Sequence, residues 1–365
     1  MRLIKILLTV ILAISITACG AAGNQQGGST PAEAPKETST ATPKEPPKEK
    51  IKLTVADSMP PGHVFSEDGA KYWMDLVTKY TDGQVEFEYY PSEQLGKVTS
   101  MLDLVRSKSA DVVYLGAAYV SDKMPLIGVA ELPGSFENAV QGNKAYWDIL
   151  NGILFEKELS KIGVRAVFTV VPPPYQVATT KKKVTTLEDF KGLKMRSGGG
   201  AQDITMSLLG ASPTKIASPE IYEAISRGTI DGGILPLTSW KGYNWQEIIK
   251  YSTYNLGMGT SALFYAINEE KYQSLPENVK QAIKKAGDET VLHVSQVVDE
   301  QNQDYVEEFR KIGVDMYEMD QNTVDELNKI LLSTWDEWAK SLKDKGHADA
   351  DAVLAAWREA LEKVK

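Results

Sequence analysis

Residues 192–203, GLKMRSGGGAQD, place one arginine at the end of a short apolar run and follow it with three glycines. Leu193–Met195 is typical of a strand and 201–209 of a helix, so Arg196 is expected at the carboxyl end of a strand, in the loop before a helix. Ligands bind at that position in open α/β sheets. A catalytic role, a phosphate cradle and a clamp for a bound anion all remain open for Arg196 on this stretch alone.

The sequence on both sides of this stretch predicts an α/β fold. Segments with the spacing of strands alternate with segments that have the 3.6-residue period of helices. Such alternation implies βαβ units and a largely parallel sheet. The spacing of Thr185 and Glu188 predicts a capping box, and Ser218 is expected to cap a helix that Gly228 ends. The predicted strands are 52–56, 85–89, 111–115, 164–171, 193–195 and 229–235.

The segment from Pro276 to Lys311 predicts a long helix, because Gly287 is its one glycine and no proline follows Pro276. At 1.5 Å per residue it is about 50 Å long, which exceeds one small domain. We therefore expect it to span two lobes. A strand near 314–319 and amphipathic helices at 324–342 and 350–364 complete the chain.

The N-terminal region predicts export. Residues 1–19 combine a basic start with an apolar run too short for a membrane span, which is typical of a signal peptide. Ala18-Cys19 resembles the lipobox of bacterial lipoproteins, which predicts a lipid anchor on Cys19. Residues 20–50 are rich in small and polar residues and are expected to form a disordered tether. The predicted lobe I comprises 51–174 with 262–304, and lobe II comprises 175–261 with 305–365.

Composition excludes several classes of partner and site. The chain has 40 basic and 49 acidic residues, with a net charge of −9 and no basic cluster, so nucleic-acid binding is not expected. Cys19 is the only cysteine, which excludes a disulfide within the chain and a cysteine-based metal site. A monomer without cofactor or metal is expected.

No arrangement of residues predicts catalysis. His63, His293 and His347 are far apart and lack the spacing of metal ligands. The nucleophile and phosphate-loop motifs are absent, and Gly198–Gly200 lacks the spacing of a dinucleotide fingerprint. A planar guanidinium offers paired donors to a carboxylate, and glycines let backbone amides approach the same anion. These observations favour an anion clamp at Arg196.

Several segments in order resemble the solute-binding proteins of tripartite ATP-independent periplasmic (TRAP) transporters. They are Tyr90–Gly96, Ala110–Val112, Glu188–Arg196, Leu209–Ala211, Pro219–Ile225, Gly228–Gly232 and Asn268–Pro276. The resemblance covers nearly all of residues 51–345. It implies two α/β lobes joined by hinges and spanned by a long helix, with an organic acid held between them and Arg196 as the family's carboxylate-binding arginine.

Two departures from the family pattern bear on the ligand. Leu235, before Pro236, replaces a usual asparagine, and Tyr175 stands 21 residues before Arg196, where many relatives carry a basic or polar contact. A second carboxylate beside Leu235 would be desolvated without a partner. The sequence therefore predicts a monocarboxylate with an apolar body. The predicted ligand-binding residues are Arg196, Tyr175, Leu235, Trp240, Tyr243, His63 and Tyr119.

The function that these observations predict is a lipid-anchored, extracytoplasmic, non-enzymatic receptor that delivers an organic acid to TRAP permease subunits in the membrane. Two alternatives remain open at this point. One is a receptor of the same fold that serves a sensor system, and the other is a secreted enzyme acting on a small acid.

Overall fold

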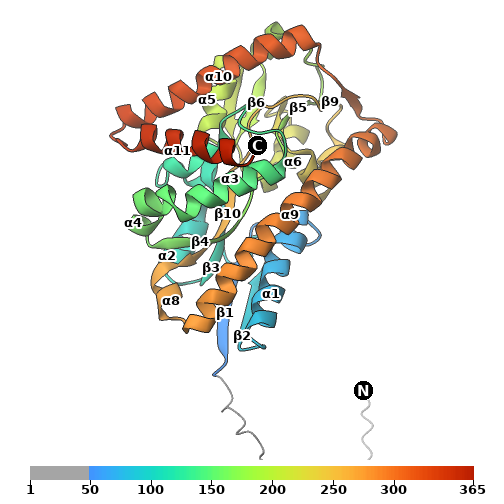
Figure 1. Ribbon diagram of the computed structural model, residues 1–365. Helices are drawn as coiled ribbons and strands as arrows, with labels where there is room; N and C mark the ends of the chain where they lie inside the picture. Colours follow the sequence, from blue (N-terminus) through green and yellow to red (C-terminus); the bar gives the residue numbers. More distant parts are fainter. Residues whose placement is uncertain (1–48) are drawn as a thin grey trace, which may run out of the picture. The chain divides into compact units, whose positions relative to one another are not determined.

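The computed structural model describes residues 49–365, so the predicted signal peptide, Cys19 and nearly all of the predicted tether lie outside the described residues. The strands in this part of the chain form two separate sheets, each covered by helices (Figure 1). Long helix α9 contacts both of them. The predicted two-lobed α/β fold is thus confirmed.

The first sheet has the strand order β2-β1-β3-β10-β4. Strands β1, β2, β3 and β4 begin and end within a residue of the predicted bounds, whereas β10 was not predicted as a strand. Helices α1, α3 and the first part of α9 pack on it. The elements are β1 (Ile51–Ala56), α1 (Tyr72–Tyr80), β2 (Val85–Tyr90), α2 (Met101–Arg106), β3 (Val112–Gly116), α3 (Ala139–Asn151), α4 (Ser160–Ile162), β4 (Val164–Val170), β10 (Leu263–Asn268) and α8 (Glu269–Ser274).

The second sheet has the order β11-β9-β5-β8-β6-β7. It carries the segment 192–203 in its β6 strand and in the helix that follows. The elements are β5 (Gln176–Thr179), β6 (Lys194–Ser197), α5 (Ala201–Leu208), β7 (Ser212–Lys215), α6 (Ile221–Ser226), β8 (Gly232–Leu235), α7 (Trp240–Tyr243), β9 (Tyr251–Thr253) and β11 (Asp315–Tyr317).

Both sheets are mixed, which corrects the expectation of a largely parallel sheet. β10 runs antiparallel to β3 and β4, and β5 runs antiparallel to β8 and β9. These two strands follow the passages of the chain from one lobe to the other. A strand entered from the other lobe starts at the end of the sheet where its neighbours finish, so it must run in the opposite direction.

Helix α9 (Glu277–Lys311) has 35 residues and joins the two lobes, as the sequence predicted. Its first part, including Val279 and Val294, packs in a core cluster of the first sheet. Tyr305 and Phe309, near its end, pack in a cluster of the second sheet. Both contacts bury one stripe of an amphipathic helix, and this burial holds the helix against both lobes.

The C-terminal helices α10 (Gln321–Asp344) and α11 (Ala350–Lys363) were expected with lobe II. Val324 and Leu327 of α10 do pack in a cluster of the second sheet. Trp338 of α10 and Trp357 of α11 pack instead in the core of the first sheet, where α11 lies against α3. α10 is thus a second helix shared by the lobes. The predicted lobe boundaries at 174/175 and 261/262 stay predictions. The strands on the two sides of each boundary, β4 and β5 at the first and β9 and β10 at the second, lie in different sheets.

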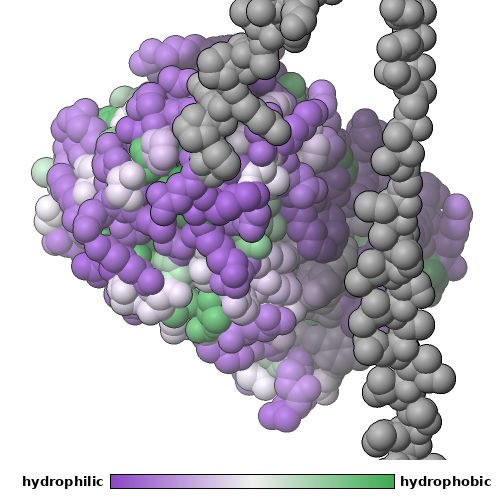
Figure 2. Space-filling view, turned by 90° about the horizontal axis from the view of Figure 1, so that it is seen from below, coloured by the Kyte–Doolittle hydropathy of each residue, from purple (hydrophilic) through white to green (hydrophobic). Residues whose placement is uncertain are grey.

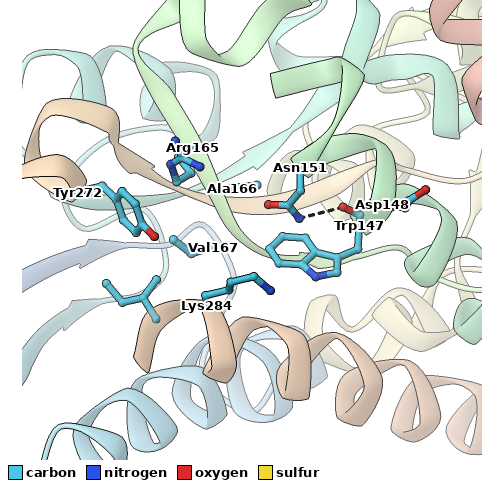
Figure 3. A pocket seen from close by; sticks show the side chains of 9 residues that line it. Trp147, Asp148, Asn151, Arg165, Ala166, Val167, Tyr272 and Lys284 are labelled. Atoms are coloured by element: carbon cyan, nitrogen blue, oxygen red, sulfur yellow. Dashed lines mark hydrogen bonds between the residues drawn. The ribbon is translucent and has the colours of Figure 1, made fainter. Parts of the chain in front are cut away.

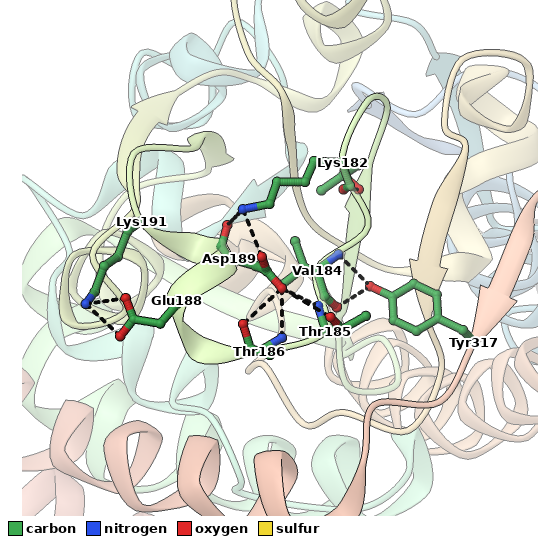
Figure 4. A network of polar contacts seen from close by, with 9 residues as sticks. Lys182, Val184, Thr185, Thr186, Glu188, Asp189, Lys191 and Tyr317 are labelled. Atoms are coloured by element: carbon green, nitrogen blue, oxygen red, sulfur yellow. Dashed lines mark hydrogen bonds and ion pairs between the residues drawn. The ribbon is translucent and has the colours of Figure 1, made fainter.

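The turn before β6 is fixed by Asp189 (Figure 4). The capping box uses Thr186 and Asp189, one residue later than the predicted pair of Thr185 and Glu188. One Asp189 oxygen accepts from the amides of Thr185 and Thr186, both at 3.0 Å, and the other lies 2.9 Å from Nζ of Lys182. The bond from Lys182 is the largest cause that holds the pKa of Asp189 well below its usual range. These contacts fix the residue at which β6 begins, and therefore the position of Arg196 in that strand.

The surface has few exposed apolar side chains. In the face shown in Figure 2, hydrophilic residues predominate and apolar ones form small separate patches. The exposed large apolar side chains within residues 49–365 are Leu208, Leu292, Ile312 and Leu332. No helix in this described part of the chain is both long and apolar enough to cross a membrane.

Candidate functional site

The loops that follow strands of the two sheets meet where the lobes touch. Tyr119 follows β3 of the first sheet. Its hydroxyl lies 3.2 Å from Nη2 of Arg196 in β6 and 3.0 Å from Oγ of Ser218, which follows β7. Parallel strands present their carboxyl ends at one edge of a sheet, and here those edges face each other. The structure thus brings Arg196 and Tyr119 of the predicted site into contact across the lobes.

Arg196 is buried, with 2% of its surface exposed, and within the described residues the hydrogen-bond partners of its guanidinium are all neutral. Nε donates to the carbonyl of Ile216 at 2.9 Å, Nη1 lies 3.4 Å from Oε1 of Gln202, and Nη2 lies 3.5 Å from Oγ of Ser218. Among residues 49–365 it forms no ion pair with a carboxylate. A buried cation without a counter-ion is costly. An anionic ligand would offset this cost.

Gln202 and the glycine run set the position of this guanidinium. Oε1 of Gln202 accepts from the amide of Gly198 at 2.8 Å, while its Nε2 donates to the carbonyl of Thr260 at 3.1 Å. A Cβ added at Gly198 would lie 2.9 Å from Cβ of Ala118 in the first lobe. The glycine at 198 therefore permits close approach of the lobes. Its amide serves Gln202, whereas the sequence suggested amides directed at the anion.

Tyr175 is buried and joins the same polar group. Its hydroxyl donates to Oγ of Ser261 at 2.6 Å, and that oxygen lies 3.5 Å from Nε2 of Gln202. Burial, which desolvates the phenolate, raises the pKa of Tyr175 well above its ordinary value. Tyr175 therefore remains a neutral phenol at physiological pH and reaches Arg196 through Ser261 and Gln202.

His63 and Tyr243 form a second contact between the lobes. Nε2 of His63 lies 3.2 Å from Oγ of Ser239, and its ring packs against that of Tyr243 with centroids 5.4 Å apart. The hydroxyl of Tyr243 lies 3.3 Å from Sδ of Met59. Burial lowers the pKa of His63 to about 3. This histidine is therefore neutral when the lobes are in contact.

Leu235 and Trp240 are both fully buried, in one hydrophobic cluster. Arg196 pairs with Gly233, and Cδ2 of Leu235 lies 3.4 Å from where a Cβ on Gly233 would be. Leu235 therefore lies on the sheet face that carries Arg196. Trp240 stacks on Phe309 of α9 at 4.8 Å between centroids. That contact packs Trp240 against the long helix.

Glu131 is a buried carboxyl group beside this site. Oε1 lies 3.3 Å from the amide of Ala262, and Oε2 has no hydrogen-bond partner within the described residues. It lines a cavity of about 260 Å³ together with Gly200, Asp203 and Trp338. Burial raises the pKa of Glu131 to about 8, and the nearby charge of Arg196 offsets only part of this effect.

Sequence reasoning missed Gln202, Ser218 and Ser261. Ser218 was expected to cap a helix, but Ala217 precedes the helical turn there and the Ser218 hydroxyl lies beside Tyr119 and Arg196 instead. Gln202 stands in the first turn after the glycine run, where a polar side chain can reach back to β6. That position is the one sequence signal that would have indicated it.

A second arginine lines a cavity of about 390 Å³ outside this site, between α3, β4, α8 and α9 (Figure 3). Arg165 donates to both carboxylate oxygens of Glu269 at 2.8 Å, and its guanidinium lies 4.8 Å from the ring centre of Tyr272. Lys284 in the same cavity lies 2.8 Å from Asp288. These cations already have counter-ions, so Arg196 is the better candidate for an anion clamp.

No group of three or more His, Cys, Asp or Glu residues with the geometry of a metal site occurs in the described part of the chain. His293 lies 3.1 Å from Asp68 and stacks on Tyr72, where α9 packs against the helical segment 65–80. It therefore pairs within the first lobe.

Residues 56–341 match the family model of the bacterial extracellular solute-binding proteins, family 7. The chain belongs to this family. Its members are solute receptors rather than enzymes, and the chain is an extracytoplasmic solute receptor of the TRAP type. The resemblance that the sequence analysis identified is confirmed.

Three similar proteins are named for, or were solved with, an organic acid. The C4-dicarboxylate-binding periplasmic protein DctP of Rhodobacter capsulatus is 25% identical over 315 residues, which are 84% of this chain and 90% of that protein. A TRAP periplasmic solute-binding protein of Bordetella bronchiseptica, with bound (R)- and (S)-mandelate, is 26% identical with a TM-score of 0.76 and covers 86% of this chain and 100% of its own. A TRAP solute-binding protein of Rhodoferax ferrireducens, with copurified benzoate, is 24% identical with a TM-score of 0.79. The match covers 86% of this chain and 98% of that protein's chain.

Proposed function

We propose that this receptor is anchored to a membrane through lipidated Cys19, captures an organic monocarboxylate between its lobes and delivers it to TRAP permease subunits. The observation that carries the ligand class is the buried guanidinium of Arg196, which has only neutral partners. A carboxylate would accept from two of its N–H groups and supply the missing negative charge.

The surroundings of Arg196 favour one carboxylate over two. Leu235, on the same sheet face, offers no donor, and Lys241 is committed to Glu308 at 2.7 Å. A second carboxylate near Leu235 would be desolvated without a partner. The tyrosines at 119, 175 and 243 supply aromatic surface and hydroxyl groups, which suit an aromatic, 2-oxo or 2-hydroxy acid. The receptors bound to benzoate and to mandelate support this choice.

Delivery to a permease follows from the family, and the lipid anchor follows from the lipobox-like sequence before Cys19. The anchor would keep the receptor at the membrane that holds its permease. Durable attachment requires at least two acyl chains, which a lipoprotein cysteine provides.

Calorimetry with a matched set of acids tests the ligand class. Benzoate, mandelate and 2-oxo acids are compared with succinate, malate and fumarate, after mass spectrometry of the small molecules released from the denatured protein. We expect at least one monocarboxylate to bind tenfold more tightly than every dicarboxylate. The reverse order would contradict the proposal.

A further inference from the structure

The contact between His63 and Ser239 joins the lobes without involving Arg196 or a group that hydrogen-bonds to it. His63 follows β1 of the first sheet, and Ser239 follows β8 of the second. Both residues are buried, with 1% and 5% of their surfaces exposed. The contact therefore has its own geometry, which is independent of the anion clamp.

The hydrogen bonds of His63 determine which ring nitrogen carries the proton. The amide of Phe65 donates to Nδ1 at 3.2 Å, so Nδ1 has no hydrogen. In the neutral ring the proton is then on Nε2, which donates to Oγ of Ser239 at 3.2 Å. Both nitrogens are satisfied, one within the first lobe and the other by the second. The ring is therefore held in one orientation and links the two lobes.

Gly242 of α7 provides the space for this ring. A Cβ added there would lie 2.5 Å from Cδ2 and 3.2 Å from Cγ of His63. Gly242 does not have the positive φ that favours glycine, so any small residue would fit its backbone conformation. What requires glycine at 242 is the imidazole ring of the opposite lobe. Because hydrogen bonds hold that ring at both nitrogens, it cannot move aside without breaking one.

We propose that His63, Ser239 and Gly242 form a lobe-closing contact that holds the receptor closed around its ligand. The proposal rests on the proposed capture of a ligand between the lobes, and it makes His63 a positioning residue. The closed state gains a neutral hydrogen bond and ring packing that are absent when the lobes separate. This differential contact shifts the equilibrium toward closure.

A double-mutant comparison tests the packing of the ring on the glycine. Gly242→Ala is made in the parent and in a His63→Ala background, with spin labels on exposed Asp75→Cys and Arg227→Cys in a full-length Cys19→Ala chain. Distances between the labels are measured with and without benzoate. We expect Gly242→Ala to reduce the closed population, and the affinity for benzoate, at least fivefold in the parent. In the His63→Ala background the added methyl should change either quantity less than twofold.

Gly69→Ala is the matched control, because its added Cβ would lie at an ordinary 3.5 Å from Phe168 within the first lobe. It should leave closure unchanged, and circular dichroism checks that every variant folds. An equal effect of Gly242→Ala in both backgrounds, no effect in the parent, or a parent without a closed population under either condition overturns the proposal. Closure of the parent that benzoate does not alter contradicts the proposed ligand class, while the distances without acid still decide on the closing contact.

Discussion

At the scale of single residues, Arg196 combines burial with the absence of a counter-ion in the described part of the chain. Arg165 is the informative comparison. It is also partly buried, yet it is neutralised by Glu269. The same side chain therefore has a structural role in one position and a free charge in the other.

Replacing Arg196 by Ala should weaken binding of the preferred acid on the order of 30-fold or more, since a carboxylate left desolvated and unpaired costs about 2–5 kcal/mol. Arg196→Lys should restore only part of the lost affinity, because an ammonium lacks the paired donors of a guanidinium. Calorimetry measures both variants, with Arg165→Ala as a control that keeps its affinity. An Arg196→Ala affinity within about threefold of the parent, together with a lowered Tm without acid, would mean that the arginine is structural.

Glu131 predicts a pH dependence of stability. Its pKa is raised from the usual 4.5 to about 8 in the folded protein, so the folded state holds this proton more tightly than the unfolded chain does. That stabilisation is complete below pH 4.5 and is lost as the pH rises through 8. The free energy of unfolding should therefore be larger at pH 5.5 than at pH 8.5.

Glu131→Gln cannot ionise and should reduce this difference by at least about 1 kcal/mol, as measured by urea unfolding at both pH values. Asp57 and Glu158 have pKa values raised by burial to about 6 and about 7, so a smaller difference of the same sign should remain. Glu137→Gln, at an exposed position, is the control. A parent that is more stable at pH 8.5 would contradict the prediction.

At the scale of secondary-structure elements, the sequence predicted what local periodicity determines. Helix α9 was expected at 276–311 and occupies Glu277–Lys311, because no internal proline interrupts its apolar stripe. The direction of β10 could not be predicted, since it depends on the lobe from which the chain arrives. The sharing of α10 between lobes was also missed, because an amphipathic pattern shows that a face is buried and not what buries it.

The candidate site was likewise predictable only where local sequence determines it. Arg196 was indicated by its place between a strand and a glycine run. Ser218 and Ser261 were not, because their contacts join turns that are far apart in the sequence. Gln202 was not, because a position six residues after Arg196 does not by itself show that its side chain turns back toward the strand. Trp240 was expected near the ligand. Its stacking on Phe309 could not be predicted, because that contact depends on where α9 ends.

Gly287 in α9 gives a prediction at this scale. A Cβ there would collide with the backbone carbonyl of Val167 in β4. Alanine gains about 1 kcal/mol of helix propensity over glycine, but a collision with backbone costs more, about 1–3 kcal/mol or above. Gly287→Ala should therefore lower the Tm by several degrees in thermal unfolding followed by circular dichroism. Glu300→Ala, at an exposed position of the same helix, is the control and should leave the Tm unchanged. A raised Tm for Gly287→Ala would contradict the close packing of α9 on Val167.

At the scale of the whole molecule, two lobes connected by α9, α10 and two crossings can change their separation while each keeps its own core. The contacts of Tyr119 with Arg196 and of His63 with Ser239 exist only when the lobes meet. A ligand that touches both lobes therefore favours the closed state.

Small-angle X-ray scattering should show this closure as a smaller radius of gyration in the presence of saturating benzoate or mandelate, from a value of about 20 Å for a compact chain of this size. Succinate, if it does not bind, serves as the control. Identical scattering curves with and without an acid that calorimetry shows to bind would count against a hinge.

The proposed anchor is tested by Cys19→Ala. The lipobox-like sequence predicts that this variant leaves the membrane fraction and keeps its affinity, because the cysteine precedes the predicted tether and the described lobes. Fractionation with a carbonate wash measures release from the membrane, and calorimetry measures the affinity. A variant that stays with the membranes would contradict lipidation at this residue.

The strand order of the first sheet has a consequence for biosynthesis. β10 lies between β3 and β4, although about 90 residues and most of the second lobe separate it from β4 in the chain. An exported polypeptide emerges with its N-terminus first. Until residue 268 has crossed the membrane, β3 and β4 have no common neighbour and each presents an unpaired edge, which is the feature that favours aggregation. The half-translocated chain is thus the stage at which this receptor most needs protection by a chaperone.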